Sequence, residues 1–140
     1  MTAMSSVSAD TPAPTLLVCI HHLSAAGAAI LENGVFCVNI LDESQPLLSD
    51  VFAGRHGDDK FAAAEWHIMK TGAPRLAAPL TAFDCRLTDS QLVGTHHILF
   101  GAVEEVFIAD AGSALIYANR DHGVARQLPP ANAQIQGGLF

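Results

Sequence analysis

The sequence predicts one mainly β domain, a small antiparallel barrel covered by one or two helices. Half of the 140 residues are apolar, which is enough for a continuous core, yet no apolar run reaches the ~20 residues of a membrane span. Two long β-like segments, residues 80–93 and 96–109, are joined at Gly94-Thr95 and predict a hairpin. Shorter segments with helix start and stop signals supply the covering helices.

The remaining strands are expected where apolar runs are short and bounded by turn-forming residues. Residues 15–21 and 35–41 fit two buried strands, and residues 114–118 fit one more after a turn at 110–113. Residues 66–79 show no clear periodicity, so we expect them to be irregular.

Three segments predict helices. Ser24 is a good N-cap for a helix through residue 31, and Gly34 is a standard stop. Residues 43–53 place their apolar side chains on one helical face, with a proline tolerated in the first turn. Residues 61–65 fit a short third helix.

The charge and the cysteine pattern exclude several classes of function. The net charge is −7 and the seven basic residues are scattered, which argues against a nucleic-acid partner. Cys19, Cys37 and Cys85 lie far apart in apolar stretches, so we expect buried free thiols in a reducing cytoplasm and no metal site. The first eight residues lack a signal peptide's features. We expect a domain at 1–126 and a loose tail at 127–140.

The best candidate for chemistry is a strand that runs through His21, His22 and Leu23 into a helix capped by Ser24. Helix N-termini carry unpaired N–H groups and partial positive charge, which favour an anion such as phosphate. The alternative is that Ser24 only caps a core helix.

Three weaker candidates remain. Residues 2–8 alternate small hydroxyl and apolar side chains, which suits an extended backbone against a flat ring, although a disordered terminus is the alternative. His96 and His97 point to opposite faces of a strand, so they cannot share one metal, and both are ordinary strand histidines in the alternative interpretation. Tyr117 with Arg120 and His122 could hold a nucleotide, but the pattern is nonspecific.

No nucleophile elbow, P-loop, HExxH or GxGxxG motif is present, and the acidic residues are dispersed. If the protein is an enzyme, an organic cofactor supplies the difficult chemistry.

Several short strings follow one another in a fixed order along the chain. They are Thr2-Ala3, Ser8, Pro14, Leu17-Val18-Cys19-Ile20, Ser24, Phe36-Cys37-Val38-Asn39-Ile40-Leu41, Phe52-Ala53-Gly54, Phe61-Ala62-Ala63-Ala64, Trp66, Phe83-Asp84-Cys85-Arg86, Gly94-Thr95-His96, Ile98-Leu99-Phe100 and Leu115-Ile116-Tyr117. Taken together, from Thr2 to about His122, they resemble the flavin reductase family of FMN-binding split barrels, closest to its pyrimidine-utilisation and 4-hydroxyphenylacetate branches.

The resemblance implies a split β-barrel that uses NAD(P)H to reduce free flavin (FMN, or FAD) for the oxygenase of a two-component monooxygenase, as a cytoplasmic homodimer. His96 would face the nicotinamide. The residues implied at the cofactors are Thr2, Ala3, Ser5, Ser6 and Val7 along the flavin ring and ribityl chain, His21, His22, Ser24 and Asn39 at its phosphate, and Tyr117 and Arg120 near the same mouth.

Two other functions stay open. One is a non-catalytic FMN-binding split barrel. The other is an oxidase of the pyridoxamine-phosphate type, for which the sequence has no basic cluster.

The chain departs from the family at His21, where Asn is usual, and at Leu23, where a polar residue is frequent. Family members usually carry a helix and strands before the Thr-Ala pair, so we expect a barrel shortened at its N-terminus, with an exposed edge.

Overall fold

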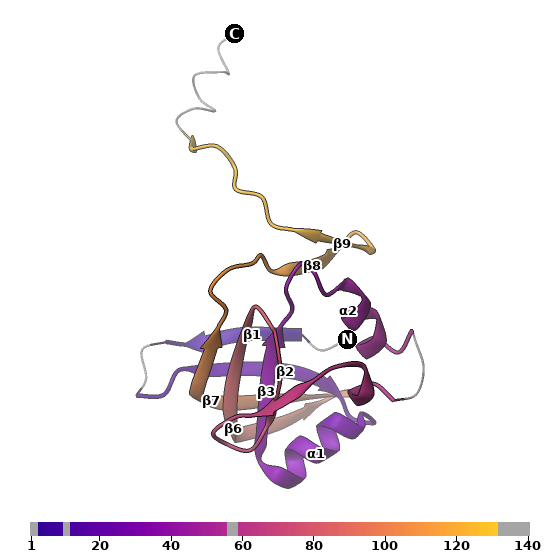
Figure 1. The fold of residues 1–140 in the computed structure, drawn as a ribbon. Helices are drawn as coiled ribbons and strands as arrows, with labels where there is room; N and C mark the ends of the chain where they lie inside the picture. Colours follow the sequence, from indigo (N-terminus) through magenta and orange to yellow (C-terminus); the bar gives the residue numbers. More distant parts are fainter. Residues whose placement is uncertain (1–2, 10–11, 56–58, 132–140) are drawn as a thin grey trace.

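The computed structural model describes residues 3–9, 12–55 and 59–131, and its centre is one antiparallel sheet of five strands in the order β1-β2-β7-β6-β3. The sheet is strongly twisted, so that β1 and β2 run across the view of Figure 1 while β3 and β6 run up it. Within the described residues β1 and β3 are the two edges, and this open, curled sheet confirms the predicted split barrel. The strands are β1 (Ala3–Ser8), β2 (Thr15–His21), β3 (Val35–Ile40), β6 (Thr81–Val93) and β7 (His96–Ile108).

The longest pairing joins β6 and β7 through a turn at Gly94, whose φ of 58° lies in the left-handed region that glycine adopts without strain. β2 pairs with the first half of β7, from Thr15 opposite Ala102 to His21 opposite His96. The predicted hairpin and the two predicted strands are therefore confirmed, but β3 is not a buried strand: among its residues only Phe36 is buried.

The core lies on one face of this sheet. Alternate residues of β2 (Leu16, Val18 and Ile20) are buried, as the period of two along a strand requires. They pack with Phe36 and with Leu99, which is fully buried.

Helix α1 (Ala25–Asn33) follows β2 and ends at Gly34, whose N–H donates to the Ile30 carbonyl at 2.8 Å. Helix α2 (Pro46–Phe52) is shorter than the predicted 43–53. The reason is a turn before it, in which the amide and hydroxyl of Ser44 both donate to the Asp42 carboxylate. Only η1 (Phe61–Ala63), a 3₁₀ turn, occupies the predicted third helix.

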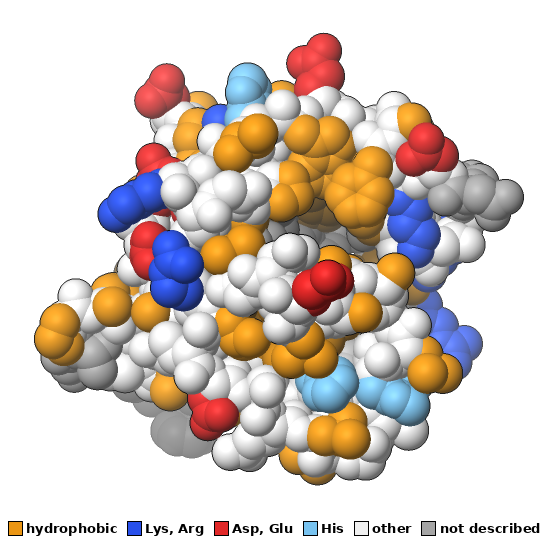
Figure 2. Space-filling model, turned by 90° about the horizontal axis from the view of Figure 1, so that it is seen from below, with side chains coloured by type: hydrophobic (Ala, Val, Ile, Leu, Met, Phe, Trp, Pro, Cys, Tyr) orange, Lys and Arg blue, Asp and Glu red, His pale blue; other side chains and the backbone are white. Residues whose placement is uncertain are grey.

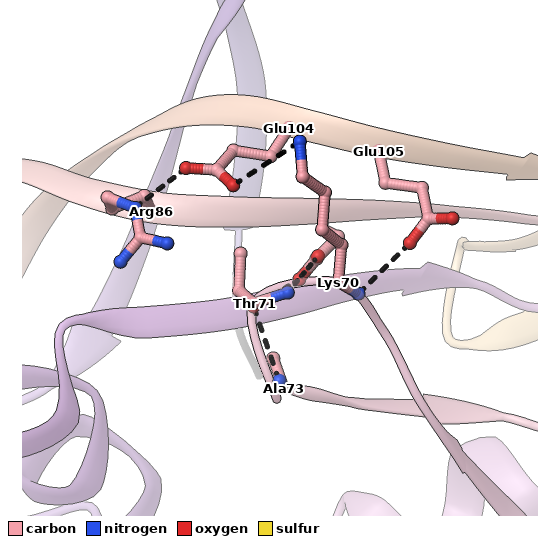
Figure 3. Close-up of polar contacts among 7 residues, drawn as sticks. Lys70, Thr71, Ala73, Arg86, Glu104 and Glu105 are labelled. Carbon is pink, nitrogen blue, oxygen red and sulfur yellow. Dashed lines mark hydrogen bonds and ion pairs between the residues drawn. The ribbon is translucent and has the colours of Figure 1, made fainter.

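The expectation of irregular structure at residues 66–79 is wrong. β4 (Trp66–Ile68) and β5 (Pro74–Leu76) form a small hairpin. Its turn is fastened to the main sheet, because Thr71 donates from its amide (2.8 Å) and hydroxyl (2.5 Å) to the buried Asp84, and the amide of Lys70 donates to Glu105 (Figure 3). Strands of three residues carry too little periodicity to be found from sequence.

A second small hairpin joins β8 (Leu115–Ala118) to β9 (Asp121–Val124), and only β8 is predicted from the sequence. Beyond it, residues 125–130 form neither helix nor strand and run away from the sheet (Figure 1). No helix in the described part of the chain is long and apolar enough to cross a bilayer.

Candidate functional site

The histidines predicted to serve the site converge at one end of the sheet. His21, the last residue of β2, lies opposite His96, the first residue of β7. Their ring centroids are 5.2 Å apart with an interplanar angle of 79°, and the His21 and His22 centroids are 4.9 Å apart. All three side chains are exposed. On the face where α1 lies, histidine side chains are exposed beside hydrophobic ones (Figure 2).

Backbone hydrogen bonds fix this end of the sheet. The amide of His22 donates to the Thr95 carbonyl at 2.9 Å, and the amide of Ser24 donates to the His21 carbonyl at 2.9 Å. The hydroxyl of Thr95 lies 3.0 Å from Nδ1 of His96. The turn between β6 and β7 therefore sits directly beside the entry into α1.

Ser24 caps α1 as the sequence predicts: its backbone is extended and its hydroxyl accepts from the Gly27 amide at 3.5 Å. Gly27 is buried, and a Cβ there would lie 3.3 Å from Ile20 Cγ2, so a small residue lets the helix approach β2 closely. The first turn contains no acidic residue, which leaves the helix N-terminus electropositive. This arrangement suits an anion.

The N-terminal segment is a strand, so the alternative of a disordered terminus is wrong for Ala3–Ser8. β1 pairs with β2, and Ser5 and Ser6 lie exposed on it. The register shifts between Ser6 and Ser8, which leaves Val7 at a bulge, where the residue is 49% exposed. Thr2 and the Ala3 side chain lie outside what the structure describes.

The side chain of Asn39 makes structural hydrogen bonds. Its Oδ1 accepts from the Leu76 amide at 2.9 Å, and its Nδ2 donates to the Cys37 carbonyl at 3.4 Å. The bond from Leu76 holds β5 against β3, whereas the bond to Cys37 lies within β3 and orients the Asn39 amide. A contribution of Asn39 to the phosphate site stays a prediction.

Tyr117 belongs to a second cluster, which the sequence only partly reveals. Arg55 donates to the Tyr117 hydroxyl at 3.1 Å and forms an ion pair of 2.6 Å with Asp50. The His122 ring lies 5.3 Å from the Tyr117 ring, and its Nε2 is 4.0 Å from Asp50. The hydrogen bond to Tyr117 raises the pKa of Arg55.

The sequence predicts Arg120 and His122 beside Tyr117. His122 packs against the Tyr117 ring, whereas Arg120 is exposed at the β8–β9 turn with φ of 65°. Arg55 is the cation that contacts Tyr117. Asp50 and Arg55 were missed because they precede the hairpin by about 60 residues, and no local pattern links the two segments.

An apolar groove of about 390 Å³ lies between α2 and the β4–β5 region. Leu47, Leu48 and Val51 of α2 form one wall, and Leu76 and Ala77 form the other. Near it, the rings of Phe52, Phe61 and Trp66 pack with centroids 5.2–5.9 Å apart.

No group of three or more His, Cys, Asp or Glu side chains suited to a metal occurs within residues 3–9, 12–55 and 59–131. Cys85 is buried, whereas Cys19 and Cys37 are half-buried, so the expectation of buried thiols is confirmed for Cys85 alone. Desolvation raises the pKa of the Cys37 and Cys85 thiols to about 12, so these two cysteines are protonated at neutral pH. Neither is a nucleophile at neutral pH.

Comparisons with known proteins show which family the chain resembles. The chain is 45% identical over 130 residues to an FMN reductase (NADH) of Methylorubrum extorquens, covering 92% of this chain and 62% of that protein. It is 46% identical to an FMN reductase (NADH) of Ancylobacter novellus, covering 83% and 65% of the two chains. The chain thus spans less than two thirds of the length of these relatives.

Two solved structures share the fold. One is a homologue of nitrilotriacetate monooxygenase component B from Mycobacterium thermoresistibile, with a TM-score of 0.81 and 30% identity over 91% of this chain and 72% of that one. The other is the flavin reductase component of a bacterial two-component tryptophan halogenase, with a TM-score of 0.76 and 28% identity over 89% and 79%. The family described as flavin reductase like domain matches residues 1–125. The chain belongs to this flavin reductase-like family.

Proposed function

We propose that this chain reduces free FMN with NADH and passes the reduced flavin to the oxygenase component of a two-component system. The observation that carries the proposal is the juxtaposition of His96 with His21, His22 and the capped N-terminus of α1. Relatives 43–46% identical are named FMN reductase (NADH), which favours FMN over FAD and NADH over NADPH.

The residues present fit a flavin by their chemistry. The first turn of α1, which follows Ser24, contains no acidic residue, so its backbone N–H groups can donate to a phosphate. The side chains of His21 and His22 can add further donors. Among the described residues β1 is an edge strand, which supports a contact between the backbone groups on its outer side and the polar edge of a flat ring. Ser5 and Ser6 add small hydroxyl side chains beside that edge, and Thr2 and Ala3 are proposed to extend it.

The chemistry that the two bound groups supply is transfer of a hydride from C4 of the nicotinamide to N5 of the flavin. Positioning is the protein's main contribution, because the reacting atoms need to approach to about 3–3.5 Å. His96 orients the nicotinamide by a hydrogen bond from its outward imidazole nitrogen. Tyr117, with Arg55 behind it, and Arg120 contact the nucleotide from the β8–β9 hairpin.

A homodimer with the flavin near the interface and a cytoplasmic location complete the proposal. Exposed aliphatic side chains lie near the histidine end of the sheet, at Leu23, Leu92 and Val93, and they support an additional contact surface there. The free, protonated thiols of Cys37 and Cys85 fit a reducing compartment.

The test is the loss of NADH absorbance at 340 nm by the full chain with and without added FMN. FMN-dependent oxidation is the expected result, and its absence with FMN and FAD, and with NADH and NADPH, overturns the proposal. The alternative function, a non-catalytic flavin-binding protein, predicts a chain that stays yellow through purification yet oxidises no nicotinamide.

A further inference from the structure

The imidazole of His96 is held from two sides. Across the strand pair, the His21 ring meets it edge-on, with centroids 5.2 Å apart and an interplanar angle of 79°. Along its own strand, the Thr95 hydroxyl lies 3.0 Å from its Nδ1. An exposed histidine otherwise samples several rotamers, so these contacts restrict the direction in which Nε2 points.

The His21 ring is itself fixed by the backbone. The amide of Leu23 donates to Nδ1 of His21 at 3.2 Å. A backbone N–H can only donate, so Nδ1 carries no proton and the neutral ring has its proton on Nε2. Two backbone bonds at the same turn, from Ser24 to the His21 carbonyl and from His22 to the Thr95 carbonyl, anchor the segment that carries this ring.

We propose that His21 is a positioning residue for His96: its ring, locked as the Nε2–H tautomer by the Leu23 amide, fixes the His96 rotamer that presents Nε2 to the nicotinamide. The inference rests on the proposed function for its consequence in turnover, but the tautomer and the rotamer belong to the protein alone. Both histidines use Nδ1 for a local bond, and within the described part of the chain no hydrogen bond occupies either Nε2.

Two variants separate the ring contact from a polar contact of His21. His21→Phe keeps an aromatic edge against His96 but removes the nitrogen atoms, whereas His21→Ala removes both. At saturating FMN, so that a weakened phosphate contact does not limit turnover, we expect His21→Ala to lower kcat/KM for NADH roughly tenfold, since small misplacements of a reacting group are costly, and His21→Phe to lower it by clearly less. His97→Phe is the matched control, because His97 neighbours His96 on the opposite face.

Nuclear magnetic resonance of the imidazole nitrogens gives a readout that does not depend on activity. We expect the His21 signals to show an unprotonated Nδ1 and a protonated Nε2. We expect His96 to hold one χ1 rotamer in the unaltered chain and in His21→Phe, and to average over rotamers in His21→Ala.

A protonated Nδ1 in neutral His21, or a His96 rotamer unchanged by His21→Ala, overturns the inference. So does a His21→Phe variant in which the His96 rotamers average as they do in His21→Ala, because the aromatic edge would then not be what holds the His96 ring. If the unaltered chain oxidises no NADH while the resonances behave as expected, the proposed function fails and the positioning of His96 stands.

Discussion

The carboxylate of Asp84, fully buried in β6, accepts two hydrogen bonds from Thr71, one from its amide and one from its hydroxyl (Figure 3). This relationship ties the β4–β5 hairpin to the central sheet across 13 residues of sequence. The same hairpin supplies Leu76 and Ala77 to the apolar groove. By holding this hairpin in place, the Asp84 carboxylate therefore helps to position the groove-lining residues Leu76 and Ala77.

Thr71→Val should destabilise the fold by about 1–3 kcal/mol, because it removes a donor and leaves a buried carboxylate oxygen unpaired. Urea unfolding followed by circular dichroism measures the loss. The control is Thr88→Val, whose hydroxyl bond to the Phe100 carbonyl is exposed and should matter much less. An equal loss of stability in the two variants would show that the Thr71–Asp84 contact contributes no more than an exposed hydrogen bond.

Gly101→Ala tests the packing between β7 and the core. A Cβ at Gly101 would lie 2.9 Å from Cys85 Cβ and closer still to the Phe36 ring. Such overpacking should cost about 1–3 kcal/mol of stability, measured by the shift of the urea midpoint. Gly123→Ala is the control, since a Cβ there meets nothing within 4 Å. A neutral Gly101→Ala would contradict this packing.

Alkaline pH should destabilise the protein through the thiols of Cys37 and Cys85. Burial raises the pKa of Cys37 and Cys85 to about 12 from an ordinary 9.0, with the negative charge of Asp84 adding to the effect. Unfolded thiols ionise through pH 9 while folded ones stay protonated, so unfolding releases protons and stability falls between pH 9 and about 12.

Urea unfolding from pH 8 to 10.5 measures this dependence. The double variant Cys37→Ala, Cys85→Ala should show a flatter fall over the range than the unaltered chain, whatever its stability at pH 8. If stability falls equally with pH in the two proteins, the thiols of Cys37 and Cys85 are not the cause of the fall.

Tyr117→Phe should loosen the β8–β9 hairpin without unfolding the sheet. The variant loses the hydrogen bond from Arg55, which joins the hairpin to the end of α2. Hydrogen–deuterium exchange of residues 115–124 should speed up severalfold, while β2 and β7 stay protected. Arg120→Lys, an exposed change on the same hairpin, is the comparison. If that variant accelerates exchange as much as Tyr117→Phe, the Arg55 contact is not what holds the hairpin.

The sequence predicts those parts of the fold whose signals are local. β2 is an apolar run, α1 has a serine cap and a glycine stop, and the β6–β7 hairpin turns at a glycine. The β4–β5 hairpin escapes prediction because Asp84 and Asn39, far away in the chain, hold it in place.

In the candidate site too, residues with a local sequence signal could be predicted and residues placed by long-range contacts could not. His21, His22, Ser24 and His96 could be selected from sequence because each borders a predicted strand or helix, and the structure brings them together. Arg55 and Asp50 could not, since only the folded chain brings α2 beside Tyr117. Thr95 stands next to His96 in the sequence, but its hydrogen bond to that ring depends on the turn geometry.

The most direct test of the central claim compares the full chain with His96→Ala by NADH oxidation at 340 nm and by quenching of FMN fluorescence on binding. The account predicts FMN-dependent NADH oxidation by the unaltered chain. His96→Ala should bind FMN equally well but lose turnover by roughly tenfold or more, since positioning of the nicotinamide is impaired. An unaltered chain that binds FMN without oxidising NADH, or a His96→Ala variant with full turnover, would contradict it.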